Sequence, residues 1–131
     1  MNEMQLADPG TEFFVACLCA AWCGTCREYR PAFEALAANR PGIGFVWVDV
    51  EDQSEYAGDL DVENFPTLVI QRGHDVLFAG PTLPEAGILA RLLDSFAGQS
   101  VAEAVAYAQG SPERRGWQGL ADVRSRLEKR V

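Results

Sequence analysis

One segment of this 131-residue chain is the most informative about its fold. It reads Phe13-Phe-Val-Ala-Cys-Leu-Cys-Ala-Ala-Trp-Cys-Gly-Thr-Cys26. From Phe13 to Ala20 every residue is apolar, which is typical of a strand buried on both faces in the middle of a sheet. From Cys23 onward, apolar residues recur with a helical period until Pro41-Gly42 ends the segment. The sequence therefore places a Cys-x-x-Cys pair at the junction between a buried strand and a helix.

This pair, Cys23 and Cys26, has the arrangement that thiol–disulfide exchange requires. One thiolate must attack a disulfide, and a second thiol must release the mixed disulfide that results. The unpaired N–H groups at a helix N-terminus favour a thiolate at Cys23, so we expect Cys23 to be the nucleophile. Cys26 lies one turn further along, and we expect it to be more buried and to act as the resolving thiol.

Two more cysteines, Cys17 and Cys19, lie in the apolar strand. Four thiolates could hold zinc or an iron–sulfur cluster. A strand of Phe, Val, Ala and Leu lacks the glycines and turns that let a chain wrap around a metal, however. We therefore expect no metal site, and we interpret Cys17 and Cys19 as small core hydrophobes.

The rest of the pattern predicts an α/β fold around a mixed sheet, in the order β-α-β-(α)-β-β-α. A capping box at Thr82-Leu-Pro-Glu85 opens the last of these helices, which Gly98 ends. A short acidic segment before the second half of the sheet is expected to be helical. The further strands are expected at residues 43–50, 67–71 and 76–79, the last two joined by a turn at 72–75.

The chain divides into a domain over residues 1–98 and a C-terminal helical extension over residues 99–131. A second capping box, Ser100-Val-Ala-Glu103, opens a short helix. We expect residues 111–131, which we call the tail, to be helical and to pack on their own domain or on a partner subunit. After Ser111-Pro112 a helical stripe continues with Trp117, Leu120, Arg124 and Leu127.

Charge and composition exclude several classes of function. The net charge of −8 argues against nucleic-acid binding, which relies on basic surfaces. Seven acids and no base lie between residues 49 and 63, whereas residues 111–131 carry six bases and three acids, so the two segments can attract each other. The first residues lack the basic region of an export signal, and the first apolar run is too short to span a bilayer. We therefore expect a cytoplasmic protein with no membrane partner.

Several motifs together resemble the thioredoxin family over about residues 11–97. They are Trp22-Cys-Gly-Thr-Cys-Arg27, Pro31, Phe65-Pro-Thr-Leu68 and Gly80. From the residues alone, Pro66 fits equally well as a strand-starting proline or as a functional cis proline. The resemblance favours the second reading, because it implies a thioredoxin fold with a cis Pro66 facing the dithiol.

The resemblance also implies an activity and a groove. A thiol–disulfide oxidoreductase of this family serves cell redox homeostasis, acts on protein disulfide substrates, depends on an upstream reductase, and needs no cofactor. The implied substrate groove is lined by Trp22, Gly24, Thr25, Phe65, Pro66 and Gly80. A thioredoxin-like binding module or chaperone, whose dithiol is secondary, is the alternative that the added tail favours.

Three features depart from the family pattern. Gly24-Thr25 stands where the family usually has Gly-Pro, and Cys17 stands where it carries a buried acid, whose usual lysine partner aligns with Trp47. If Cys17 faces Cys26 it could be a third redox thiol, although we expect core packing. Finally, few residues precede the first strand, so we expect the family's extra N-terminal strand and helix to be missing or vestigial.

Overall fold

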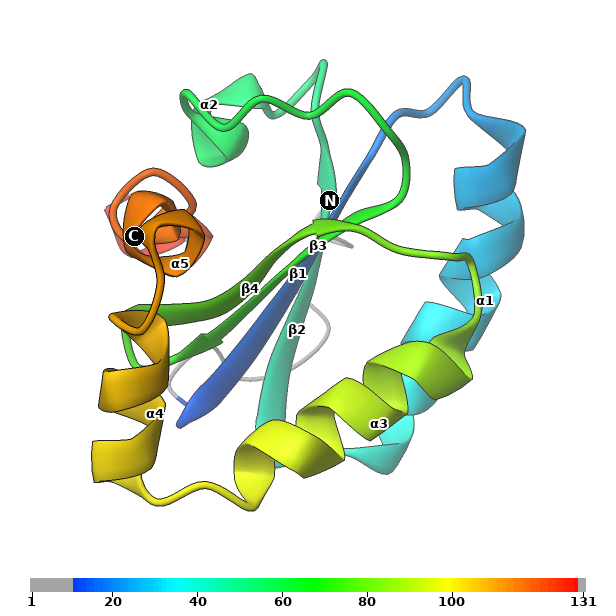
Figure 1. Cartoon of the computed structure of the whole chain (residues 1–131). Helices are drawn as coiled ribbons and strands as arrows, with labels where there is room; N and C mark the ends of the chain where they lie inside the picture. The colour runs from blue at the N-terminus through cyan, green and yellow to red at the C-terminus, as the bar shows by residue number, and fades with distance from the viewer. Residues whose placement is uncertain (1–10, 130–131) are drawn as a thin grey trace.

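The structure is a computed structural model that describes residues 11–129. It confirms the expected order of elements, with further helices in the tail (Figure 1). The elements are β1 (Phe13–Cys19), α1 (Gly24–Asn39), β2 (Ile43–Asp49), α2 (Ser54–Ala57), β3 (Thr67–Arg72), β4 (Asp75–Pro81), α3 (Ala86–Ala97), α4 (Val101–Ala108), α5 (Pro112–Trp117) and α6 (Val123–Glu128).

The four strands form one mixed sheet in the order β2-β1-β3-β4. β1 runs parallel to β2 and antiparallel to β3, and β3 pairs antiparallel with β4. β1 is a central strand, and helices pack on both faces of the sheet, which explains why the sequence of β1 is apolar throughout. The register pairs Cys17 with Trp47 of β2 and with Leu68 of β3.

Each face of the sheet builds its own hydrophobic cluster. Successive side chains of a strand point to opposite faces. Val15, Cys17 and Cys19 therefore join one cluster with α1, α3 and α4, which we call the dithiol-side cluster. The other face, with Phe14 and Leu18, joins a second cluster with α2 and the tail, which we call the tail-side cluster. Figure 1 shows α1 and α3 on one side of the sheet and α5 on the other.

The tail supplies the cover of the second face. Ala121 and Val123 are fully buried in the tail-side cluster, and the ring of Trp117 lies 5.9 Å from that of Phe78 of β4. The expectation that the tail is helical and packs on its own domain is confirmed. Within residues 11–129, β1 is the first element, and no helix precedes it. Among these residues, the tail helices therefore lie on a sheet face that no N-terminal helix covers.

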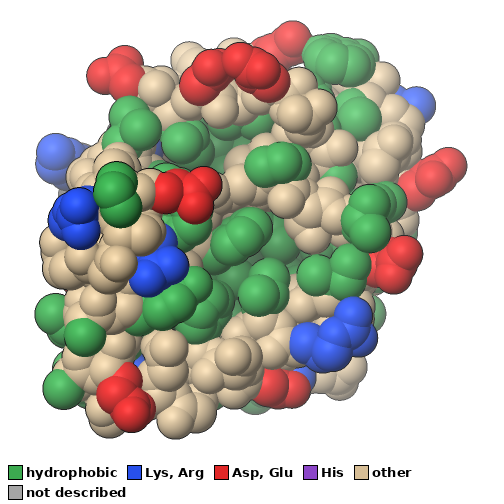
Figure 2. All heavy atoms as spheres, viewed as in Figure 1, with side chains coloured by type: hydrophobic (Ala, Val, Ile, Leu, Met, Phe, Trp, Pro, Cys, Tyr) green, Lys and Arg blue, Asp and Glu red, His purple; other side chains and the backbone are tan. Residues whose placement is uncertain are grey.

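The expected attraction between the basic tail and the acidic segment takes a different form. Acidic side chains lie along the upper rim of the molecule, over α2 (Figure 2). Arg126 of α6, however, donates to the backbone carbonyls of Tyr56 and Ala57, each at 3.2 Å, at the end of α2. The docking contact therefore uses backbone carbonyls at the C-terminus of α2, where the helix dipole favours a cation.

Two sequence expectations about helix ends and stripes are wrong. α3 begins at Ala86 with Glu85 as its N-cap, and the hydroxyl of Thr82 donates to the carbonyl of Leu83 instead of capping the helix. The helical stripe expected after Pro112 is interrupted between α5 and α6, where Gly119 has a φ of 79° and Leu120 is 41% exposed. The capping box at Ser100 and Glu103 is confirmed.

A side chain of the tail closes the outer edge of the sheet. The amide of Gln118 accepts from the N–H of Val76 and donates to the C=O of the same residue, both at 2.8 Å. An edge strand with unpaired backbone groups invites pairing with another chain. Gln118 therefore satisfies β4 at one position in the way that a neighbouring strand would.

Arg124 joins the tail to the start of β1. It is 6% exposed, and its guanidinium donates to the carbonyls of Thr11, of Glu12 at 3.3 Å and of Gly73 at 3.4 Å. The same group lies 5.7 Å from the ring of Phe14. Burial of a cation is costly unless hydrogen bonds or opposite charges compensate it. Arg124 can therefore be buried only when the tail is docked against the start of β1.

Asp122, the N-cap of α6, should make the docking of the tail sensitive to acid. Burial alone would raise its pKa, but hydrogen bonds from the side chain of Gln71 and from Ser125, with the charge of His74, outweigh burial and lower the pKa. A carboxyl group whose pKa is lowered in the folded state stabilises the fold at pH values above its ordinary, unfolded-state pKa. This contribution is lost as the pH falls through the folded-state pKa.

We therefore expect the free energy of unfolding of wild type to exceed that of Asp122→Asn at neutral pH, and the difference to shrink in acid. Urea unfolding at a series of pH values measures it. Glu113→Gln, which removes an exposed carboxylate of the same tail, is the control. A difference that grew as the pH fell would contradict the assignment.

Candidate active site

Cys23 stands where the strand gives way to the helix. It is the N-cap of α1, with an extended backbone at φ −83° and ψ 117°. Its N–H donates to the carbonyl of Ala20 at 3.0 Å, and its own carbonyl accepts from the N–H of Arg27 at 3.2 Å. The side chain is half-buried and the thiol is free. The expected position of Cys23, at the junction of strand and helix, is confirmed.

Cys26 lies inside the first turn of α1 and is 2% exposed, as expected of a resolving thiol. In this structure it is joined by a disulfide to Cys19, with the two Cα atoms 5.9 Å apart. The interpretation of Cys19 as a simple core hydrophobe is therefore wrong. Cys19 and Cys26 meet because β1 and α1 both turn these positions into the dithiol-side cluster.

Cys17 is the remaining free cysteine, and it is fully buried. Its sulfur lies 3.8 Å from that of Cys19. Burial raises the pKa of the Cys17 thiol well above its usual range, against a smaller lowering influence from the charge of Arg30. Core packing is confirmed for Cys17, and the cysteine bonded to Cys26 is Cys19 instead.

The proposed groove begins with two aromatic rings beside the dithiol. Trp22 is 62% exposed, and its ring meets that of Phe65 edge-on, with the centroids 5.6 Å apart. The indole N–H of Trp22 donates to Glu51 at 2.9 Å, which ties the ring to the acidic segment. The Phe65–Pro66 bond is cis, as the resemblance implied. Gly24 and Thr25 are exposed on the same turn as Cys23.

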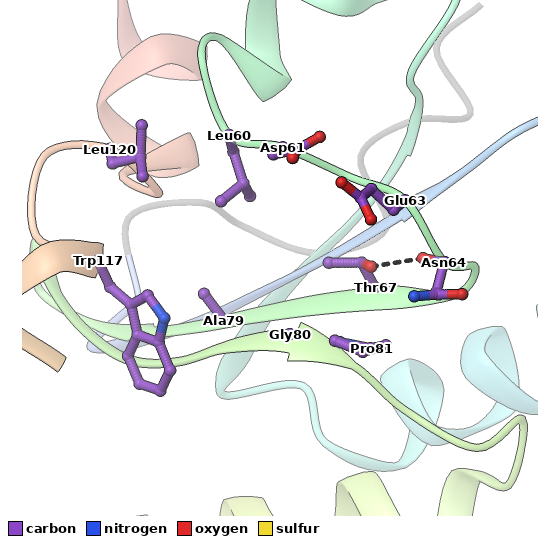
Figure 3. Close-up of a pocket in the computed structure, with 10 residues that line it drawn as sticks. All are labelled: Leu60, Asp61, Glu63, Asn64, Thr67, Ala79, Gly80, Pro81, Trp117 and Leu120. Carbon is purple, nitrogen blue, oxygen red and sulfur yellow. Dashed lines mark hydrogen bonds between the residues drawn. The ribbon is translucent and has the colours of Figure 1, made fainter. Parts of the chain in front are cut away.

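Gly80, the last residue of the predicted groove, lies in a pocket on the tail side (Figure 3). The pocket has a volume of about 340 Å³, and Trp117 and Leu120 of the tail form one of its walls. None of the other predicted groove residues lines this pocket, and sequence reasoning did not predict that Trp117 and Leu120 would line it. Because α5 lies beside β4 only in the folded chain, the sequence held no local signal for this contact.

The sequence of the chain and this geometry agree with one known family. The thioredoxin family model matches residues 3–87. The chain belongs to the thioredoxin family. A Streptomyces coelicolor protein named as a thioredoxin is 38% identical over 78 residues, which are 59% of this chain and 58% of that protein. The chain thus spans less than two thirds of that relative.

Solved thioredoxin structures share the fold. The structure of thioredoxin from Trypanosoma brucei brucei has a TM-score of 0.61 and 27% identity, covering 68% of this chain and 79% of that one. The structure of Fasciola hepatica thioredoxin has a TM-score of 0.60 and 28% identity, covering 66% and 83%. The thioredoxin fold is therefore shown, with a mixed sheet and additional C-terminal helices.

The departures from the thioredoxin pattern now have a structural meaning. Cys17 and Trp47 occupy paired positions on neighbouring strands, and both pack in the dithiol-side cluster. A buried carboxylate at position 17 could have taken a proton from the resolving thiol. A thiol with a raised pKa stays neutral near pH 7 and cannot do so. Position 17 therefore offers no general base to a neighbouring thiol.

Proposed function

We propose that this protein is a thiol–disulfide oxidoreductase that exchanges disulfides with protein partners through Cys23 and Cys26. The observation that carries the proposal is the placing of a half-buried free thiol at the start of α1, with Cys26 buried one turn later. Cys23 alone among the four cysteines is not fully buried, so it is the thiol that a protein substrate can reach.

The reaction begins with both cysteines reduced. The Cys23 thiolate attacks a substrate disulfide and releases one substrate thiolate. Cys26 then attacks the sulfur of Cys23, which breaks the mixed disulfide and releases the second substrate thiolate. The exposed edge of Trp22 beside Phe65 offers an apolar surface on which the substrate chain can rest.

The partners follow from this chemistry. Each turnover leaves the protein oxidised, so an upstream reductase must restore the thiols.

A cytoplasmic location is part of the proposal, because Cys17 and Cys23 are free thiols and the cytoplasm keeps thiols reduced.

Reduction of insulin tests the proposal. With dithiothreitol as electron donor, the reduced protein should speed the precipitation of insulin chains beyond the rate that dithiothreitol alone gives. A folded protein that left the rate at this background would contradict the proposal and would favour a thioredoxin-like binding module.

A further inference from the structure

Cys19 has no part in the exchange proposed for Cys23 and Cys26, yet it is the cysteine bonded to Cys26. Its Cα lies 5.9 Å from that of Cys26, within the usual range for a disulfide. Cys19 and Cys26 are 0% and 2% exposed, whereas Cys23 is half-buried. Cys26 is therefore within reach of a second partner on the side facing the core.

We propose that Cys19 is a second resolving thiol, which takes Cys26 over from Cys23 and moves the disulfide into the core. The proposal rests on the function proposed above, which supplies the Cys23–Cys26 disulfide. The Cys19 thiolate attacks the sulfur of Cys26, so the Cys19–Cys26 bond forms and the Cys23–Cys26 bond breaks. The electron pair leaves on Cys23, and the proton of Cys19 passes to solvent. One disulfide replaces another, so the step needs no oxidant or reductant.

The surroundings of the three sulfurs favour this direction. A thiolate on Cys19 would sit among the apolar side chains of the dithiol-side cluster, where burial penalises charge. A thiolate on Cys23 would lie at the half-exposed start of α1, where water can reach it. Exchange therefore places the neutral disulfide in the core and the charge at the surface.

The oxidised protein consequently keeps a free nucleophile. With Cys26 held by Cys19, a mixed disulfide formed on Cys23 has no resolving partner in the chain. It ends when a second thiolate of the substrate attacks the substrate sulfur and Cys23 leaves as a thiolate. The substrate has then exchanged one disulfide for another without net reduction. In this state the protein is an isomerase of protein disulfides.

Mapping the disulfide of the oxidised full-length chain tests the proposal. The protein is oxidised with oxidised glutathione, freed of excess reagent and quenched in acid. Free thiols are blocked with N-ethylmaleimide, and the remaining cysteines are reduced and labelled with iodoacetamide. No Lys or Arg precedes Arg27, so trypsin leaves all four cysteines in one peptide, whose fragmentation reads the label at each position. The intact mass reports any glutathione adduct.

In wild type we expect maleimide on Cys17 and Cys23, and iodoacetamide on Cys19 and Cys26. Cys19→Ala should lose the maleimide at Cys23, because Cys26 then keeps its bond to Cys23. Cys17→Ala, which removes a buried thiol 3.8 Å away, should keep the wild-type pattern. A wild-type chain with a free Cys19 and a Cys23–Cys26 disulfide would overturn the proposal, whether or not the variants fold.

Insulin reduction separates this proposal from the one on which it rests. Cys19→Ala retains Cys23 and Cys26 and should reduce insulin at least as fast as wild type, because no core disulfide then competes for Cys26. If Cys19→Ala reduces insulin and the disulfide of oxidised wild type is found between Cys23 and Cys26, only the role proposed for Cys19 is wrong. If neither protein reduces insulin but the core disulfide is found, the pairing stands and the function in net reduction is wrong.

Discussion

Cys23→Ser should reduce the rate of insulin reduction to that of dithiothreitol alone. A serine hydroxyl is not ionised near pH 7 and does not attack disulfides, so no mixed disulfide forms. The substitution replaces one sulfur atom by oxygen at a half-buried position, so we expect the fold to be kept. The rate of insulin precipitation and the far-UV circular dichroism spectrum measure the two effects.

Cys17→Ser is the matched control for this loss. It makes the same chemical change in a cysteine that is fully buried and forms no disulfide. We expect its insulin reduction to stay close to that of wild type, with some loss of stability because a hydroxyl replaces a thiol in an apolar cluster. Equal loss of activity in both folded variants would remove the distinction between Cys23 and the core cysteines.

Deletion of residues 111–131 should unfold the protein under conditions in which the full chain is stable. The deletion exposes the apolar sheet face that Ala121 and Val123 cover, and it removes Arg124 from the carbonyls beside β1. We expect a loss of about 5 kcal/mol or more in the free energy of unfolding, comparable with the whole net stability of a small domain. Urea unfolding monitored by circular dichroism measures it.

Two single substitutions show whether burial in the tail-side cluster is the cause. Val123→Ala removes two methyl groups from a fully buried side chain and should cost about 2 kcal/mol. Leu120→Ala truncates a neighbour that is 41% exposed and should cost less than about 0.5 kcal/mol. A truncated chain as stable as the full one would show that the sheet does not need the tail.

Sequence patterns predicted the elements that depend on local rules. A pattern of a few neighbouring residues is enough to predict each of these elements. Examples are the apolar run of β1, the helical period of α1 and the capping box at Ser100. The cis peptide at Pro66 came from the resemblance to a family, since the residues alone left it open.

The contacts between distant segments could not be read in the same way. The strand period places Cys17 and Cys19 on one face, but it does not say which of them reaches Cys26. That depends on where α1 crosses β1. The stripe in the tail was likewise shifted, because Gly119 breaks the helix and brings Ala121 and Val123 to the sheet.

The most direct measurement of the central claim uses Cys26→Ser. This variant lacks the thiol that resolves a mixed disulfide, so a substrate captured by Cys23 should stay attached. The reduced variant is mixed with insulin and quenched in acid, and the adduct is mapped by mass spectrometry. We expect an insulin chain on Cys23. A folded variant that forms no adduct, or carries it on Cys17 or Cys19, would contradict the assignment of Cys23 as the nucleophile.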